Sequence, residues 1–260
     1  VLLKNDNNAL PLKSSEIRSI AVIGDNAKRK HANQGFGAGA KTRTEVTPYD
    51  ALVAHYPDMK VNYALGYKEQ YLKNDLNRSW GLPVDYVPNE QLVAEAVAAA
   101  KASDVAVVFA GSNRLVETEA EDRKGLRLPF GQEALIKAVK AANPNTIVVI
   151  IAGSPHDLSE IDATVDGLLW SWFNGSRAGD AIVDVLFGEV NPSGKLPVTF
   201  PKKREDSPAH ATNSFPGGPD VVIYEEGILV GYHWFDTQNI EPFYPFGYGL
   251  SYTSFEYSDL

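Results

Sequence analysis

The chain has 260 residues, of which 44% are hydrophobic and 22% charged, so it can bury a sizeable core as one large domain or two small ones. Its formal net charge of -9, without a lysine and arginine cluster, argues against nucleic acid or an acidic membrane surface as its partner. The absence of cysteine excludes disulfides, zinc thiolate sites and cysteine nucleophiles, and no apolar run approaches the ~20 residues of a membrane span.

Strand-like and helix-like segments alternate along the first three quarters of the chain. Apolar runs predict strands at 19–24, 59–64, 105–110, 146–152 and 167–172. These runs are continuous rather than alternating, which is typical of parallel strands covered on both faces. Helices are predicted from Thr47-Pro48 onward and over 89–102, 130–142 and 178–187. The order indicates βαβ units, and therefore a three-layer α/β/α sandwich with a mostly parallel sheet of about six strands.

Two regions interrupt this alternation. Residues 71–87 are polar and irregular, which predicts a surface loop. From residue 191 onward helix periodicity is lost, and prolines, glycines and aromatic residues become frequent. Disordered tails lack aromatic residues, so we expect this part to be an ordered segment that wraps around the domain.

Two short motifs favour structural interpretations. The glycine-rich stretch 35–40 neither follows a strand nor has the G-x-G-x-x-G spacing, so it indicates a flexible loop close to a ligand rather than a nucleotide site. Residues 154–157 place Ser, His and Asp side by side, but the members of a triad usually meet through folding. We therefore interpret them as a loop and helix N-cap. The remaining histidines have no metal-ligand spacing, and no cofactor is implied.

The segment 116–123 holds four carboxylates and one arginine in eight residues. It follows the apolar run 105–110, and ligands of open α/β sheets bind at the carboxyl ends of strands. One interpretation is a solvated charged turn with local ion pairing. The other is acid/base chemistry, because a second carboxylate raises the pKa of a carboxylic acid and an arginine keeps its neighbour ionised. Such a loop can supply a proton donor near neutral pH.

Ordered pieces over nearly the whole chain resemble the α/β-sandwich domain of glycoside hydrolase family 3, the family of β-glucosidases, β-xylosidases and N-acetylglucosaminidases. The matching pieces are 2–5 with 9–12, 20–27, 119 with 122–129, 188–200, 226–232 and 244–253. The resemblance implies a linker leading into the domain at 1–12 and a sandwich domain with an acid/base loop at 13–250. Residues 251–260 would begin a following module or tail.

The resemblance also implies a retaining, exo-acting β-glycosidase that hydrolyses terminal β-linked sugars from oligosaccharides or glucosides. In such enzymes one carboxylate attacks the anomeric carbon and a second acts as acid and then base. In the family the nucleophile is an Asp on a (β/α)₈ barrel, while this domain supplies the acid/base Glu. The chain has no barrel of its own, so it would carry half of an active site and be inactive alone.

Residue by residue, Glu119 matches the position of the acid/base, and Glu117 is the alternative because it shares a face with Glu119 on an extended loop. Glu121 is a more distant choice. The glycine-rich loop with its neighbour Lys41 matches the region where the family builds its aglycone subsite. Phe36 and Lys41 are expected there, and Arg114 and Arg123 are the further substrate-binding residues that we expect.

Other functions remain open at this point. A β-xylosidase of the same family is one alternative, and a non-catalytic carbohydrate-binding or assembly module is another. A nucleotide-dependent α/β enzyme is a weaker third. The acidic loop favours a glucosidase or xylosidase, because N-acetylglucosaminidases of the family often use a barrel His as acid/base. The sequence does not decide the compartment, although a secreted or periplasmic one is favoured.

Overall fold

The computed structural model describes residues 1–32, 41–69, 84–114, 116–117, 122–256 and 258. Two residues expected in the site, Phe36 and Glu119, lie outside these ranges, as does Glu121. Most of the predicted surface loop at 71–87 lies outside them as well.

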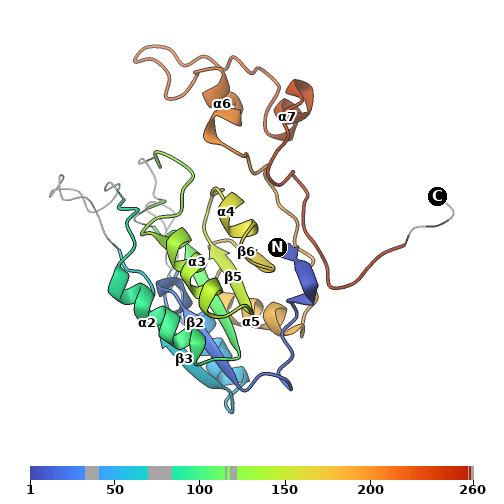
Figure 1. Ribbon diagram of the computed structural model, residues 1–260. Coiled ribbons are helices and arrows are strands. Elements are labelled where there is room, and N and C mark those ends of the chain that lie inside the picture. The colour runs from blue at the N-terminus through green and yellow to red at the C-terminus, as the bar shows by residue number, and fades with distance from the viewer. Residues whose placement is uncertain (33–40, 70–83, 115, 118–121, 257, 259–260) are drawn as a thin grey trace.

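A six-stranded sheet with the order β1-β6-β5-β4-β2-β3 forms the middle layer (Figure 1). Its strands are β1 (Leu2–Asn5), β2 (Ser19–Ile23), β3 (Lys60–Ala64), β4 (Val105–Gly111), β5 (Thr146–Ile151) and β6 (Gly167–Ser171). Strands β2 to β6 pair in parallel, while β1 pairs with β6 in the antiparallel sense. The predicted mostly parallel sheet is therefore confirmed, together with the strands expected within it.

The edge strand β1 comes from the segment 1–12, which was expected to be a linker. Leu2 and Leu3 are both buried, and they enter the cores on opposite faces of the sheet. Four residues are too few to show a period, and the pairing of β1 with β6 is a tertiary contact across more than 160 residues. The leading segment is thus part of the sandwich.

Helices cover both faces of the sheet. The helices are α1 (Pro48–His55), α2 (Glu90–Lys101), α3 (Gln132–Ala142), α4 (Ser159–Asp162), α5 (Ala178–Phe187), α6 (Pro208–Ala211) and α7 (Tyr232–Gln238), with short 3-10 turns η1 (Asp6–Asn8), η2 (Asp25–Ala27) and η3 (Arg204–Asp206). Helices α2, α3 and α4 pack on one face, and α1 and α5 on the other. None of the helices within the described ranges is long and apolar enough to cross a membrane.

Strand β4 shows why its sequence is apolar without alternation. Ala106, Val108 and Ala110 point into the core under α2 and α3. Their neighbours Val105, Val107 and Phe109 point into the core under α1 and α5. Since successive side chains alternate between faces, a strand between two helix layers needs an apolar residue at every position.

The predicted start of α1 is confirmed by its N-cap. The hydroxyl of Thr47 accepts a hydrogen bond from the backbone N–H of Asp50 (3.2 Å), and the Asp50 carboxylate accepts one from the backbone N–H of Thr47 (3.4 Å). We expect Thr47→Ala to lower the free energy of unfolding by about 1 kcal/mol in urea denaturation, because the backbone N–H of Asp50 loses its acceptor and the Asp50 carboxylate loses the hydroxyl that donates to it (2.8 Å). Thr47→Ser keeps the hydroxyl and should stay within a few tenths of a kcal/mol of the parent. Equal losses for both variants would contradict the capping role.

Residues 188–256, beyond α5, are ordered but do not wrap the domain throughout. Phe200 and Tyr244 pair in an antiparallel bridge, and both side chains are buried, with the Phe200 ring 4.7 Å from that of Trp170. Between these two anchors, residues 201–243 leave the body as an arm that carries α6 and α7. Figure 1 shows the arm standing off the body on the side where α4 and β6 end. The expected wrapping is thus limited to the segments that flank the arm.

Candidate active site

The candidate site lies where β4 and β5 end. Gly111 closes β4 with a positive φ of 118°, and a Cβ atom there would lie 2.0 Å from the carbonyl oxygen of Ile151. The buried Gln132 side chain holds this turn, because its amide bonds both the N–H (2.7 Å) and the C=O (2.8 Å) of Gly111. The loop after β4 therefore leaves the sheet at a fixed point beside the loop after β5.

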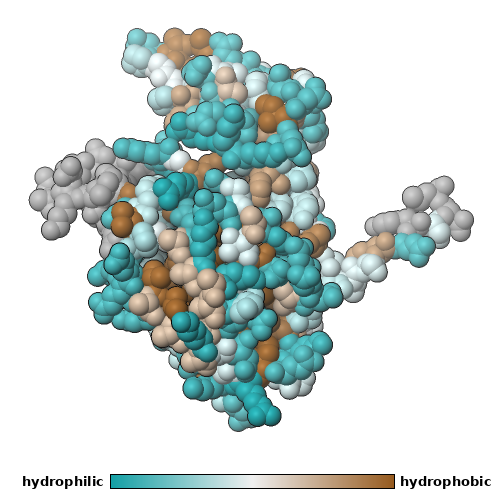
Figure 2. Space-filling view, in the orientation of Figure 1, coloured by the Kyte–Doolittle hydropathy of each residue, from teal (hydrophilic) through white to brown (hydrophobic). Residues whose placement is uncertain are grey.

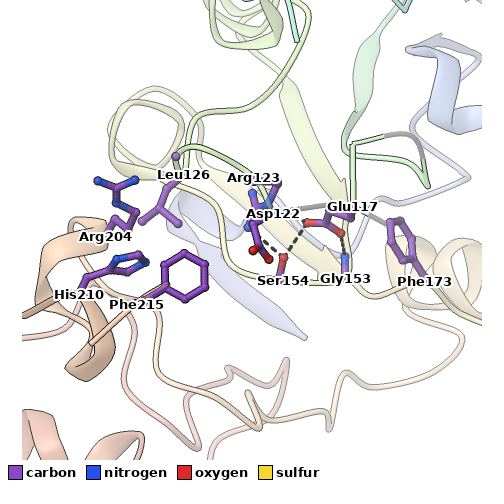
Figure 3. Close-up of a pocket in the computed structure, with 11 residues that line it drawn as sticks. Glu117, Asp122, Arg123, Leu126, Gly153, Ser154, Phe173, Arg204, His210 and Phe215 are labelled. Atoms are coloured by element: carbon purple, nitrogen blue, oxygen red, sulfur yellow. Dashed lines mark hydrogen bonds and ion pairs between the residues drawn. The ribbon is translucent and has the colours of Figure 1, made fainter. Parts of the chain in front are cut away.

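Glu117 in the loop after β4 is held by the loop after β5 (Figure 3). Its carboxylate accepts hydrogen bonds from the backbone N–H of Gly153 (2.6 Å) and from the hydroxyl of Ser154 (2.8 Å). The Arg123 Nε lies 3.5 Å from the same carboxylate, and the His156 Nε2 lies 3.4 Å from it. The side chain of Glu117 is only 10% exposed.

These contacts fix the protonation state of Glu117. Burial by itself would raise the pKa of this carboxyl, but the hydrogen bond from His156, the charge of Arg123 and the hydroxyl of Ser154 outweigh it. The net effect lowers the pKa of Glu117 to about 2. The group is therefore a carboxylate throughout the neutral range and has no proton to donate there.

Arg123 joins the two loops from the other end of the acidic segment. Its Nη2 donates to the Ser154 hydroxyl (2.9 Å) and to the Pro155 carbonyl (2.7 Å). Its Nη1 lies 2.9 and 3.1 Å from the two ring nitrogens of His156. Burial lowers the pKa of His156, with the charge of Arg123 acting in the same direction, so the ring is held in its neutral form. We call Glu117, Arg123, Ser154 and His156 the anchor cluster.

The anchor cluster changes the interpretation of residues 154–157. They do include a local cap, since the Asp157 carboxylate accepts from the N–H (3.0 Å) and the hydroxyl (2.6 Å) of Ser159 at the start of α4. Ser154 and His156, however, bind the acidic segment rather than one another. Sequence reasoning missed both as site residues. Their place directly after a second buried strand was the signal that could have found them.

A pocket of about 560 Å³ opens beside the anchor cluster, between the body and the arm. Its lining residues are Glu117, Asp122, Arg123, Gly125, Leu126, Gly153, Ser154 and Phe173 from the body, and Arg204, His210 and Phe215 from the arm. Figure 3 shows the arm residues gathered on one side and the Glu117 carboxylate with Gly153 and Ser154 farther across. Charged and aromatic groups that face one space of this size suit a polar ligand with apolar faces.

The structure separates the expected site residues. Glu117 and Arg123 lie together at the pocket, as partners of one another. Lys41 and Arg114 are exposed and do not line this pocket.

Comparisons with known proteins agree with one another. The family model of the glycosyl hydrolase family 3 C-terminal domain matches residues 1–252. The chain is 44% identical to thermostable beta-glucosidase B of Acetivibrio thermocellus, over 100% of the chain and 32% of that protein. It is 37% identical to an exo-alpha-(1->6)-L-arabinopyranosidase of Bifidobacterium longum, over 98% of the chain and 32% of that protein. Among solved structures, a Bifidobacterium adolescentis beta-glucosidase superposes with a TM-score of 0.82 at 37% identity, over 98% of this chain and 34% of that one. The chain spans about a third of the length of these relatives.

Proposed function

This chain belongs to glycoside hydrolase family 3 as its C-terminal domain, and we propose that it supplies the acid/base half of a retaining, exo-acting β-glucosidase. In this proposal a (β/α)₈ barrel domain brings the nucleophilic Asp, and the acidic loop after β4 brings the proton donor. The substrate is a β-glucoside or β-linked oligosaccharide, cleaved at its terminal sugar. The match along the whole chain to thermostable beta-glucosidase B supports the substrate class, and the anchored acidic loop supports the role.

The anchor cluster is the observation that carries the assignment of the acid. Glu117 has a pKa of about 2 and is buried among four partners, so it is unsuited to donate a proton near neutral pH. Glu119, two residues further along, is then the candidate in the acidic loop that the family resemblance favours. A fixed carboxylate also favours the protonated form of a carboxyl placed near it, which is the form that an acid catalyst needs.

The roles of the other residues follow from a mechanism that retains the configuration at the anomeric carbon. Glu119 protonates the leaving oxygen while the nucleophile forms a glycosyl intermediate, and then takes a proton from the attacking water. The two carboxyl groups of such a pair stand about 5–5.5 Å apart, so the barrel must approach the pocket closely. Arg123 and Glu117 act as positioning residues, since they tie the two ends of the segment 118–121 to the loop after β5.

The proposal is tested with a hybrid enzyme in which the chain replaces the matching 32% of thermostable beta-glucosidase B. We expect the hybrid to hydrolyse 4-nitrophenyl β-D-glucopyranoside, with the β-anomer of glucose as the first product seen by proton NMR. The 260-residue chain alone should show no turnover. A folded hybrid without activity, an α-anomer as first product, or turnover by the chain alone would contradict the proposal. A folded, inactive hybrid that still binds glucosides would favour the non-catalytic module instead.

A further inference from the structure

The outer part of the arm exposes a group of large apolar side chains. Between residues 213 and 240, all of which are described, Phe235 is the one buried side chain. The exposed fractions are 64% for Val221, 55% for Val222, 57% for Ile223, 75% for Tyr224, 91% for Ile228 and 64% for Val230. We call these six residues the apolar tip. Figure 2 shows hydrophobic residues on the part of the molecule that projects above the body.

The apolar tip is carried by an arm that is fixed at its base. The backbone N–H groups of Phe200 and Phe243 bond the carbonyls of Tyr244 and Phe200 across the antiparallel bridge, at 2.8 Å each. Within the arm, the Trp234 indole N–H donates to the Asp206 carbonyl (3.2 Å), which joins α7 to η3. The arm thus has its own internal contacts. Large apolar groups exposed together on such a fixed element mark an interaction surface.

The arm also borders the proposed active site. Arg204, His210 and Phe215 form one wall of the pocket, and the Arg204 Nη1 donates to the Lys124 carbonyl (2.9 Å) just beyond the acidic segment. A domain that completes the pocket from outside must therefore come close to the arm. The four consecutive residues 221–224 carry no charge, so they can be buried provided that the flanking carboxylates of Asp220 and Glu225 stay at the rim of the interface.

We propose that the apolar tip is the docking surface for the domain that precedes this one in its relatives, which would supply the nucleophile. This inference rests on the proposed function, since it requires a domain that approaches the pocket. The chain covers only 32% of the A. thermocellus relative, so most of that protein is available to form the other side of the interface. The tip would hold the incoming domain against the arm, while the other wall of the pocket presents the acidic loop.

The test compares amide hydrogen exchange of residues 218–232 in the isolated chain and in the hybrid enzyme. We expect exchange in this segment to be at least tenfold slower in the hybrid, because docking removes its backbone from water. Ile223→Asp combined with Ile228→Asp should restore fast exchange in the hybrid and divide its thermal unfolding into two transitions. Val190→Asp is the matched control, since Val190 is 52% exposed and follows α5, outside the arm. It should change neither measurement.

The outcomes separate docking from catalysis. Glu119→Gln in the hybrid should lower activity and leave the slowed exchange of residues 218–232 unchanged. Failure of the catalytic assignment and failure of the docking proposal therefore give different results. Equal exchange of residues 218–232 in the isolated chain and in a folded hybrid would overturn the proposal. So would slow exchange in the isolated chain together with dimers in sedimentation, because a second copy would then cover the tip. If the Asp variants fail to fold, Tyr224→Ser with Val230→Ser makes the same test with a milder change.

Discussion

Glu119→Gln in the hybrid enzyme is expected to lower kcat/KM for phenyl β-glucoside by about 10²–10⁴-fold, the range typical of a lost general acid. Phenolate is a poor leaving group, so its departure depends on protonation of the glycosidic oxygen in the transition state. From the 2,4-dinitrophenyl glucoside, the 2,4-dinitrophenolate leaves without being protonated. Formation of the glycosyl intermediate from this substrate should therefore be nearly unaffected. Steady-state kinetics on the two substrates measures this difference directly.

Two further measurements test whether Glu119, rather than a neighbouring carboxylate, is the acid/base. Azide should accelerate turnover of the dinitrophenyl glucoside by the variant and give β-glucosyl azide, because azide attacks the glycosyl intermediate without needing a base. Glu121→Gln is the matched control in the same acidic segment, and it should retain most activity on both substrates. Unchanged activity of Glu119→Gln on the phenyl glucoside would overturn the assignment. A larger loss for Glu121→Gln would move the acid/base role to that residue.

The parts of the fold that were predictable are those with local causes. Strands β4 and β5 are buried at every position because helices cover both of their faces. This requirement produces short, continuous apolar runs that can be recognised in the sequence. The start of α1 is likewise local, since Thr47, Pro48 and Asp50 cap it within four residues. Strand β1 and the projecting arm depend on pairings between distant segments, Leu2 with Leu169 and Phe200 with Tyr244, which no local pattern reports.

The candidate site divides in the same way. The acidic segment could be found because it follows a buried strand, and its resemblance to the family's acid/base loop pointed to Glu119. The role of Glu117 could not be predicted, because its protonation depends on Gly153, Ser154 and His156, more than 35 residues further along the chain. Sequence spacing made Glu117 an alternative acid, whereas its partners lower its pKa and keep it an anion near neutral pH.

That anion leads to the largest stability effect we expect. Glu117→Gln in the 260-residue chain should lower the free energy of unfolding at pH 7 by about 3–5 kcal/mol in urea denaturation, because it removes the negative charge that Glu117 places beside the largely buried Arg123 guanidinium. The pKa of about 2 leads to a similar figure, since a displacement from the ordinary 4.5 corresponds to about 3 kcal/mol. Glu16→Gln is the matched control, because Glu16 is 65% exposed and forms a surface ion pair with Lys13. It should cost less than about 1 kcal/mol.

The pH dependence distinguishes this charge effect from a simple packing defect. A carboxyl whose pKa is lower in the folded state binds fewer protons there than in the unfolded chain, so its stabilisation is complete above the ordinary pKa of 4.5. It is lost progressively as the pH falls from there through about 2. The parent chain should therefore lose stability over this window, while Glu117→Gln loses less, and the difference between them should shrink toward the acid end. A difference that stays constant from pH 7 to pH 3 would mean that Glu117 acts through its shape, and it would return Glu117 to the list of possible proton donors.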